Sequence, residues 1–147
     1  MEIILVQPEI PQNAGNIART CAATGTRLVF VKPLGFSLSD RQLKRAGLDY
    51  WEHLDYTVVE EVDWEEAPTY FFSTHGHISY HSVKFESNSR LVFGPESSGL
   101  PKELLARFPQ QVVKIPMLAG RRSLNLSNSV AIALYEALRQ HHFKELL

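Results

Sequence analysis

Hydrophobic runs separated by short polar stretches predict the first elements of the chain. Residues 2–7 are aliphatic with little alternation, which is typical of a strand buried on both faces. Residues 11–24 predict a helix with one apolar face, because Pro11 suits a first turn and Gly25 suits a C-terminal stop. A second apolar run, 27–31, follows almost at once. Strand, helix and strand at this spacing predict a βαβ unit, and therefore a parallel sheet with a right-handed crossover.

The rest of the chain continues this alternation and predicts an α/β fold, a mostly parallel sheet flanked by helices. Further strands are expected near 56–59, 69–73, 91–93 and 111–115, with a polar, irregular segment over 75–89. Further helices are expected from a Ser39-Asp40 cap to about Ala46, where Gly47 closes the helix, from Pro101 onwards, and over roughly 127–141. No repeat, low-complexity tract or linker divides the chain, so residues 1–147 are expected to form a single domain.

The closing helix is apolar on nearly every side between residues 130 and 138. Such a helix must be buried all round, and a small domain obtains that burial most readily from a partner subunit. Ser127 or Asn128 suits its N-cap, which would open backbone N–H groups toward the preceding loop. The pattern therefore favours an assembly that packs through the C-terminal helix.

The composition is that of a globular, cytoplasmic protein. With 147 residues, of which 44% are hydrophobic and 21% charged, the chain can bury one core and shows no sign of disorder. We find no signal peptide at its start, and no apolar run approaches the roughly 20 residues of a membrane span. The single cysteine, Cys21, excludes a disulfide framework and is expected to be a buried structural thiol. No metal site is expected, because His75-x-His77 is the nearest approach to ligand spacing.

The charge balance limits how this protein could hold a nucleic acid. The net charge is −1 and the pI about 6.6. Domains that grip a phosphate backbone over a wide area have pI values above about 9. Either nucleic acid is not the partner, or the contact is confined to local basic patches.

A basic stripe on the predicted second helix is one candidate patch. Arg41, Lys44 and Arg45 stand at positions i, i+3 and i+4, and the aromatic pair Tyr50-Trp51 follows. Basic charge beside exposed aromatic rings suits phosphate contact and base stacking. The alternative is a solvated helix face with the tryptophan in the core. The pair Arg121-Arg122 would add a second patch.

Three loops after predicted parallel strands are candidates for a ligand site, because open α/β sheets bind ligands at the carboxyl ends of their strands. The loops cover 73–76, 94–99 and 116–125, and small or polar residues in them let a ligand approach the backbone. The 94–99 loop lacks the Lys-Ser/Thr of a P-loop, and no G-x-G-x-x-G occurs, so neither nucleotide motif is supported. Read alone, each loop could be an ordinary turn.

The predicted helix over 11–24 carries Asn13, Asn16 and a single charged residue, Arg19. Asn16 and Arg19 are three residues apart, so they share a face away from much of the apolar stripe. One arginine flanked by asparagines in so uncharged a helix favours a functional site. A solvated polar face is the alternative.

Four motifs stand in order along the chain, and the similarity that they carry covers nearly all of it. They are Asn13-x-Gly15-Asn16-x-x-Arg19, then Arg45-Ala46-Gly47-Leu48-Asp49-Tyr50, then Leu91-Val92-Phe93-Gly94-Pro95-Glu96-x-x-Gly99-Leu100-Pro101, and last Ile115-Pro116-Met117 with Arg122-Ser123-Leu124-Asn125-Leu126-Ser127-Asn128. Together they resemble the SPOUT superfamily, and within it the small YibK-like (TrmL) tRNA 2′-O-methyltransferases.

The resemblance implies a deep trefoil knot in the C-terminal part, a homodimer through the C-terminal helix, and methylation of the wobble cytidine or uridine ribose in leucine tRNAs. It implies S-adenosylmethionine bound by Phe72, Thr74, Gly94, Glu96, Ile115, Met117, Ser123, Leu124 and Asn125. The implied catalytic residue is Arg19, which works near the partner's cofactor with Asn13 and Asn16 beside it. The expected RNA-binding residues are Arg41, Lys44, Arg45, Arg121, Arg122 and Tyr135.

Three positions depart from the family pattern and leave alternatives open. Ser98 and His75 stand where relatives often carry a basic residue, and Leu124 stands where methionine is common. The first two remove positive charge on the RNA side, so the sequence leaves the tRNA and the nucleotide open. Alternatives are a ribosomal RNA 2′-O-methyltransferase, disfavoured by the lack of an added RNA-binding domain, a non-catalytic RNA-binding module, and a small-molecule enzyme.

Overall fold

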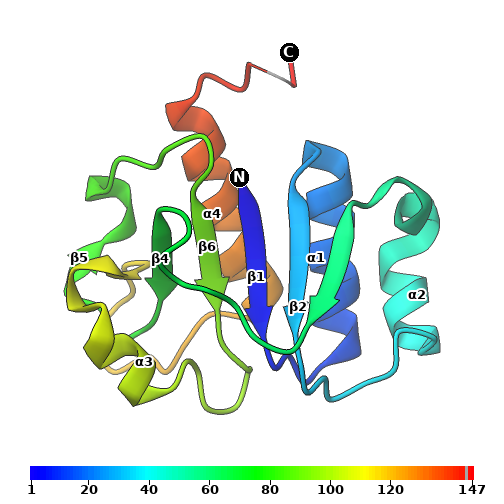
Figure 1. The fold of residues 1–147 in the computed structure, drawn as a ribbon, viewed down its shortest axis with the longest axis horizontal. Coiled ribbons are helices and arrows are strands. Elements are labelled where there is room, and N and C mark those ends of the chain that lie inside the picture. Colours follow the sequence, from blue (N-terminus) through cyan, green and yellow to red (C-terminus); the bar gives the residue numbers. More distant parts are fainter. Residues whose placement is uncertain (145) are drawn as a thin grey trace.

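The computed structural model describes residues 1–144 and 146–147, in which seven strands form one sheet with helices on both faces (Figure 1). The strands are β1 (Glu2–Val6), β2 (Arg27–Val31), β3 (Tyr56–Val59), β4 (Thr69–Phe72), β5 (Ile78–Ser79), β6 (Arg90–Phe93) and β7 (Val112–Lys114). The α-helices are α1 (Pro11–Thr24), α2 (Arg41–Gly47), α3 (Lys102–Arg107) and α4 (Leu126–Gln140). Three 3-10 segments are η1 (Leu48–His53), η2 (Tyr80–Ser82) and η3 (Pro109–Gln111).

The sheet has the order β3-β2-β1-β6-β4-β7-β5, and every pair of neighbours in it is parallel. From β1 the chain builds outward through β2 and β3, and the later strands lie on the other side of β1. The strand order therefore reverses between β1 and β6, whose register pairs Leu5 with Phe93. Sheets of this kind bind ligands in the crevice beyond such a reversal. The parallel sheet with flanking helices confirms the predicted fold class, and the knot stays a prediction.

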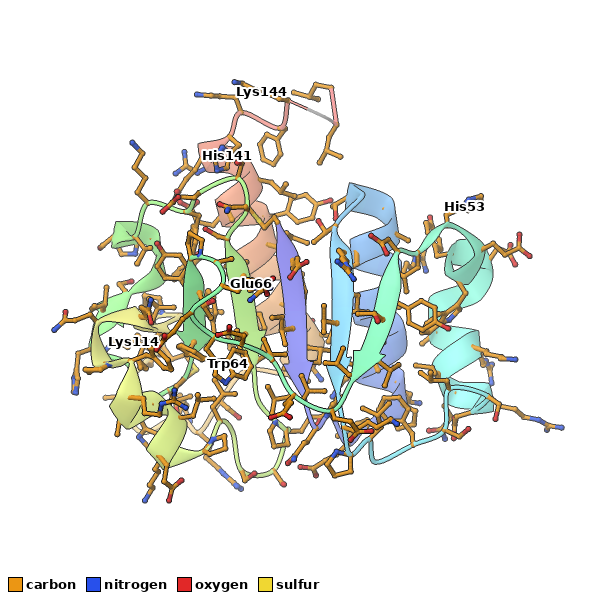
Figure 2. All side chains as sticks on the ribbon, in the orientation of Figure 1. His53, Trp64, Glu66, Lys114, His141 and Lys144 are labelled. Carbon is orange, nitrogen blue, oxygen red and sulfur yellow. The ribbon has the colours of Figure 1, made fainter. Side chains whose placement is uncertain are left out.

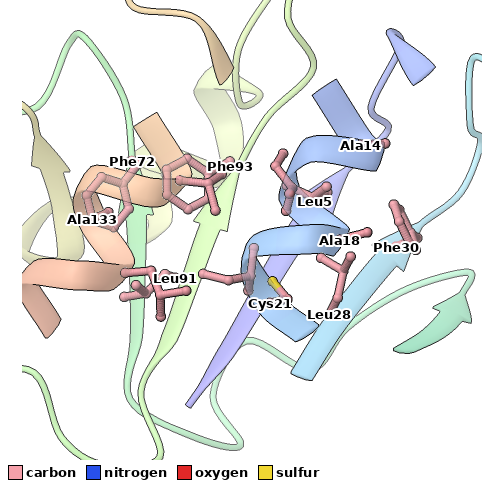
Figure 3. Packing of buried hydrophobic residues seen from close by; sticks show 14 of the residues in the cluster. Leu5, Ala14, Ala18, Cys21, Leu28, Phe30, Phe72, Leu91, Phe93 and Ala133 are labelled. Atoms are coloured by element: carbon pink, nitrogen blue, oxygen red, sulfur yellow. The ribbon is translucent and has the colours of Figure 1, made fainter. Parts of the chain in front are cut away.

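Both faces of the central strands are buried, as the aliphatic runs predict. Alternate residues point to opposite faces, so Leu5 faces α1 and α4 whereas Ile4 faces the side of α3. Figure 3 shows the larger cluster, in which helix residues such as Ala18 and Cys21 pack over β1, β2 and β6. The two clusters hold the strands rigidly, which fixes where their carboxyl ends lie.

The contact between α1 and α2 is unusually close because Gly15 has no side chain. A Cβ added at Gly15 would lie 2.5 Å from the Cβ of Ala46 and 2.6 Å from the carbonyl oxygen of Leu43. Helix α1 itself starts at Pro11 and ends at Gly25, whose φ of 64° is left-handed, as predicted. The two helices therefore form one layer beside β1 and β2.

The structure refines three local expectations. Gly47 is the last residue of α2, as predicted, but its φ of −76° and ψ of −18° are helical, and the chain continues directly into η1. The N-cap of α4 is Asn125, whose side chain accepts hydrogen bonds from the backbone N–H groups of Ser127 and Asn128, the two residues predicted to cap it. A two-residue strand, β5, lies inside the segment expected to be irregular.

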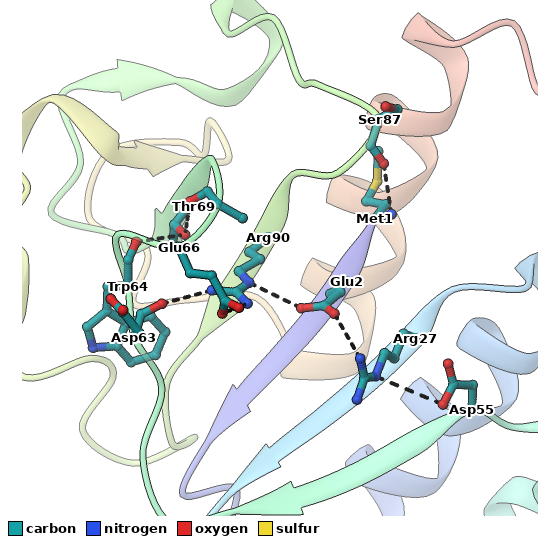
Figure 4. A network of polar contacts seen from close by, with 11 residues as sticks. Met1, Glu2, Arg27, Asp55, Asp63, Trp64, Glu66, Thr69, Ser87 and Arg90 are labelled. Atoms are coloured by element: carbon teal, nitrogen blue, oxygen red, sulfur yellow. Dashed lines mark hydrogen bonds and ion pairs between the residues drawn. The ribbon is translucent and has the colours of Figure 1, made fainter.

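An ion-pair network ties the amino ends of the strands together, at the edge opposite the carboxyl ends (Figure 4). Glu2 accepts hydrogen bonds from Arg90 at 3.2 Å and from Arg27 at 3.4 Å. Arg90 also donates to Glu66 at 2.6 Å, and Arg27 lies 3.9 Å from Asp55. The charged side chains at this edge of the sheet pair with one another. A ligand site is therefore expected at the opposite edge, where the strands have their carboxyl ends.

The outward side of α4 lacks the all-round burial that its apolar sequence predicts. Ile132 is 37% exposed and Tyr135 is 47% exposed, whereas Val130, Ala133 and Leu134 are buried against the sheet.

Charged and polar side chains such as His53 and Lys144 project from the rest of the surface (Figure 2). None of the described helices combines the length and apolar character needed to cross a membrane.

Candidate functional site

The three predicted loops meet beyond the carboxyl ends of β4, β6 and β7, and with the start of α1 they line one open cavity of about 490 Å³. This volume is in the range of small-molecule and cofactor sites. All nine residues expected to bind the cofactor line the cavity, as does Asn13 from α1. The structure thus brings together residues that lie as far apart in the sequence as Asn13 and Asn125.

Aromatic packing and a tight loop shape one wall of the cavity. The rings of Phe72 and Phe93, at the ends of β4 and β6, stack with centroids 4.7 Å apart and an angle of 15° between their planes. Next to them, a side chain at Gly94 would collide with the backbone of Gly99 and Leu100. The loop after β6 can fold back over the strand end only because glycine stands there.

Glu96 connects this loop to the beginning of α1. Its carboxylate accepts hydrogen bonds from the backbone N–H of Glu9 at 2.7 Å, the backbone N–H of Ile10 at 3.0 Å and the Asn13 amide nitrogen at 3.2 Å. Glu9 reciprocates by accepting from the Ser97 hydroxyl at 2.6 Å. Glu96 lines the cavity, yet both of its oxygens hold the helix start, where a negative charge also suits the helix dipole.

Asn13 extends this connection to the third loop. Its side-chain oxygen accepts a hydrogen bond from the Asn125 amide at 3.0 Å, while its own amide donates to Glu96. Asn125 in turn caps α4 by accepting from the backbone N–H of Ser127 at 2.9 Å. The loops after β6 and β7 are therefore held to each other through one buried asparagine of α1.

Arg19 and Asn16 lie outside the cavity wall. Both are exposed on α1, and the Cζ atom of Arg19 lies over the ring of Tyr50, 5.2 Å from its centroid. The structure therefore separates the three residues assigned to catalysis, because Asn13 is buried in the cavity wall whereas Asn16 and Arg19 face solvent beside α2 and η1.

The predicted basic patches are exposed, and the aromatic pair beside the first patch is half-buried. Arg41, Lys44 and Arg45 are exposed along α2. The indole of Trp51 packs edge-on against Tyr56, at 5.5 Å between centroids, and contacts the core. Trp51 thus packs at the border of the core, and RNA binding by the basic stripe stays a prediction.

Only one residue of the second basic patch, Arg121-Arg122, belongs to the cavity wall. Arg122 lines the cavity and Arg121 does not, although both are exposed. Tyr135 lies on the exposed side of α4, with the ring of Phe143 6.3 Å away.

Several residues line the cavity beyond those that the sequence assigns to cofactor binding, and Tyr50 is an unexpected neighbour of Arg19. The additional residues in the cavity wall are Ile10, Ser73, His75, Phe93, Pro95, Ser97, Ser98, Gly99, Leu100, Leu126 and Ser129. Most belong to loops that were recognised as candidates, but single serines carry no distinguishing pattern. The contact between Tyr50 and Arg19 joins residues 31 positions apart, and only the packing of α1 on η1 creates it.

Other reactive groups in the described part of the chain do not form a second centre. No group of three or more His, Cys, Asp or Glu side chains gathers there as metal ligands would. Cys21 is fully buried, and this burial raises the pKa of its thiol to about 12. A thiol with so high a pKa is a poor nucleophile, which agrees with the structural role expected of it.

Comparison with known proteins gives a consistent result along the whole chain. The model of the SpoU rRNA Methylase family matches residues 1–135. A tRNA (cytidine(34)-2′-O)-methyltransferase of Methylovorus glucosotrophus is 51% identical over 150 residues, which cover 97% of this chain and 96% of that protein. A solved structure described as giving insights into the 2-OH methylation of C/U34 on tRNA is 49% identical with a TM-score of 0.90, covering 96% of this chain and 95% of that one.

A more distant structure carries a cofactor. The SpoU methyltransferase AviRb of Streptomyces viridochromogenes, solved in complex with AdoMet, is 25% identical with a TM-score of 0.85. The match covers 97% of this chain and 60% of that one. The fold described above is therefore shared by an AdoMet-bound methyltransferase.

Proposed function

Because the chain belongs to the SpoU rRNA Methylase family, we propose that it transfers a methyl group from S-adenosylmethionine to the ribose 2′-OH of the wobble nucleotide, cytidine or uridine, of tRNA. The observation that carries this proposal is the near-full-length similarity to a tRNA (cytidine(34)-2′-O)-methyltransferase at 51% identity. Leucine tRNA is the substrate that the sequence resemblance implies.

The cavity beyond β4, β6 and β7 fits S-adenosylmethionine. Its volume of about 490 Å³ suits a ligand of this size, and the apolar wall of Phe72 and Ile115 suits an adenine ring. The loop residues Gly94, Ser123 and Asn125 offer close backbone approach and polar groups around it. When bound, the cofactor supplies an electrophilic methyl group on its sulfonium.

The chain's own residues must position the ribose and handle its proton. A 2′-OH is a weak nucleophile that loses its proton as it attacks, and alignment of the reacting atoms can supply much of the acceleration. A guanidinium presents five N–H donors in a planar fork that suits phosphate oxygens. We assign Arg19 to holding an RNA phosphate and stabilising the developing alkoxide, and a phosphate oxygen of the substrate to accepting the proton.

A homodimer through α4 completes this proposal. Arg19 lies outside the cavity of its own chain, so within one chain it is not placed beside a cofactor. Ile132 and Tyr135 leave an apolar side of α4 exposed for a second copy. In such a dimer Arg19 of one protomer would work at the partner's cavity, and the basic residues of α2 and of the 116–125 loop would be present twice for tRNA.

Labelled S-adenosylmethionine tests the reaction and its substrate together. The purified protein is incubated with the labelled cofactor and with bulk tRNA or ribosomal RNA, and the 2′-O-methylated nucleotides are mapped. We expect label at the wobble position of tRNA. Label in ribosomal RNA alone would favour the other activity named in the family's description. Cofactor binding without transfer to either RNA would favour a binding module without chemistry.

A further inference from the structure

The guanidinium of Arg19 rests on an aromatic ring rather than on a carboxylate. Its Cζ lies 5.2 Å from the centroid of the Tyr50 ring, within the range of a cation–π contact. None of the ion pairs found among the described residues involves Arg19. The one charged group of α1 is therefore held by a ring face.

Close packing of α1 against α2 and η1 fixes the backbone that carries this ring. Tyr50 belongs to η1, which continues α2 without a break because Gly47 keeps a helical conformation. Gly15 lets α2 approach α1 until a single added Cβ would collide with it. The next residue, Trp51, is packed against Tyr56 and the core. The packing of Gly15 and Trp51 thus fixes the backbone segment that carries Tyr50, and the half-buried Tyr50 ring lies beneath the exposed Arg19 side chain.

A ring suits this position better than an acid would. A carboxylate would also attract the guanidinium, but it would accept the N–H donors and neutralise the charge that an RNA phosphate needs. The face of a ring attracts the cation and leaves the N–H groups at the guanidinium edge free to donate. Tyr50 can therefore restrict the arginine without competing with its ligand.

We propose that Tyr50 is a positioning residue, which presents the Arg19 guanidinium to the RNA through a cation–π contact. This inference rests on the proposed function, since the aligned guanidinium matters only if Arg19 acts on RNA. The interpretation of the aromatic pair as a base-stacking surface is replaced by one in which Tyr50 serves Arg19 and Trp51 serves the core.

A series of ring substitutions at Tyr50 tests the contact. Replacement by phenylalanine and by phenylalanines carrying one, two and three fluorines weakens the cation–π attraction stepwise with little change in ring shape. We expect phenylalanine to support transfer close to the wild-type rate, kcat to fall with each fluorine, and Tyr50→Leu to lose about 5- to 30-fold in all. The affinity for S-adenosylmethionine by calorimetry and the Tm should stay constant across the fluorinated series.

Tyr56 supplies the matched control. It packs edge-on against Trp51 and Phe30 and does not carry Arg19. The same fluorinated series at Tyr56 should leave kcat unchanged. In NMR spectra, the Arg19 Nε–H signal, assigned through Arg19→Lys, should lose its ring-current shift in Tyr50→Leu and keep it in Tyr50→Phe.

The outcomes separate this inference from the reaction itself. A wild-type protein that methylates tRNA, together with rates that stay flat across the Tyr50 series, would overturn the role of Tyr50 and leave the proposed function standing. A wild-type protein that methylates no RNA would overturn both. An equal fall at Tyr50 and Tyr56 would indicate a general packing effect and would also reject the cation–π role.

Discussion

At the scale of single residues, Asn13 joins two loops of the site through its side-chain amide. Its amide donates to Glu96 and its side-chain oxygen accepts from Asn125, so both polar groups are used inside a side chain that is only 6% exposed. A buried asparagine with both groups paired specifies one arrangement of its neighbours, because any displacement leaves a polar group unsatisfied. The family resemblance implies a catalytic role for this residue, which stays a prediction, and the structure shows that it also joins two loops.

Replacement of Arg19 separates chemistry from cofactor binding. Arg19→Ala should lower the rate of methyl transfer by about 100-fold or more, the effect expected when a donor to a developing negative charge is lost. Cofactor affinity measured by calorimetry should stay near the wild-type value, because Arg19 is not in the cavity wall. Normal turnover in this variant would remove Arg19 from the mechanism.

The thiol of Cys21 makes a specific prediction for alkaline pH. Burial raises its pKa from 9.0 to about 12. Between these values the folded chain keeps a proton that the unfolded chain has lost, so rising pH favours unfolding by about 1.4 kcal/mol per pH unit. Below about pH 9 the thiol is protonated in both states, so its contribution to the unfolding free energy does not change with pH.

The matched variant for this prediction is Cys21→Ala. We compare urea unfolding of the wild-type protein and the variant at pH values from about 8 to 11. Lysines and tyrosines titrate in both proteins, so the difference between the two unfolding free energies isolates the thiol. The difference in unfolding free energy should be flat up to about pH 9 and then fall. A constant difference at all pH values would contradict a buried, neutral thiol.

At the scale of elements, the layer of α1 and α2 depends on one missing side chain. Gly15→Ala should destabilise the fold by about 1–3 kcal/mol, because the new methyl group overlaps Ala46 and the Leu43 carbonyl. Alanine would otherwise favour a helix by up to about 1 kcal/mol over glycine, so a loss of stability identifies the steric cause. Chemical denaturation measures the change, and Gln12→Ala on the exposed side of α1 is the control. A stabilised Gly15→Ala variant would mean that α2 can move away at no cost.

The periodic elements could be predicted from the sequence and the irregular junctions could not. Strands β1 and β2 and helix α1 are long enough for their apolar pattern to be distinct, and they lie where predicted. A two-residue strand such as β5 has no periodicity, so it was missed. Glycine at position 47 correctly predicts where α2 ends, but the sequence does not show that its φ is helical and that the chain continues into η1. A side chain at Gly47 would collide with the Trp51 ring, and this contact is visible only in the structure.

The same distinction applies to the candidate site. The three loops were recognised because each follows a strand, and a parallel sheet brings all strand ends to one edge. Contacts between side chains at this edge of the sheet depend on distances in space, which the spacing of residues along the sequence does not give. The three hydrogen bonds that Glu96 accepts at the start of α1 are therefore visible only in the structure.

At the scale of the whole molecule, the apolar side of α4 predicts a dimer. Ile132→Glu places a charge on that side, and burying an unpaired charge is costly enough to prevent association. Analytical ultracentrifugation should give a dimer for the wild-type protein and a monomer for this variant. Methyl transfer should be lost with the dimer, since Arg19 would no longer reach a partner's cavity.

A charge change elsewhere provides the control for this prediction. Lys102→Glu alters an exposed residue of α3, on the other face of the sheet from α4. This variant should keep the dimer mass in ultracentrifugation and the wild-type rate of methyl transfer. A wild-type protein that is monomeric and active would contradict the dimer and the shared site together.

The links around Asn13 also set the time at which the protein can first act. They join the start of α1 to Glu96 and to Asn125, partners that lie 83 and 112 positions further along the chain. The N-terminal half of the chain emerges from the ribosome first, so α1 is synthesised long before the residues that complete its surroundings. The cavity cannot close until the segment leading into α4 has been synthesised. Binding of the cofactor to a nascent chain would therefore report that translation is nearly finished, and a truncated product would have no pocket with which to withdraw cofactor from the cell.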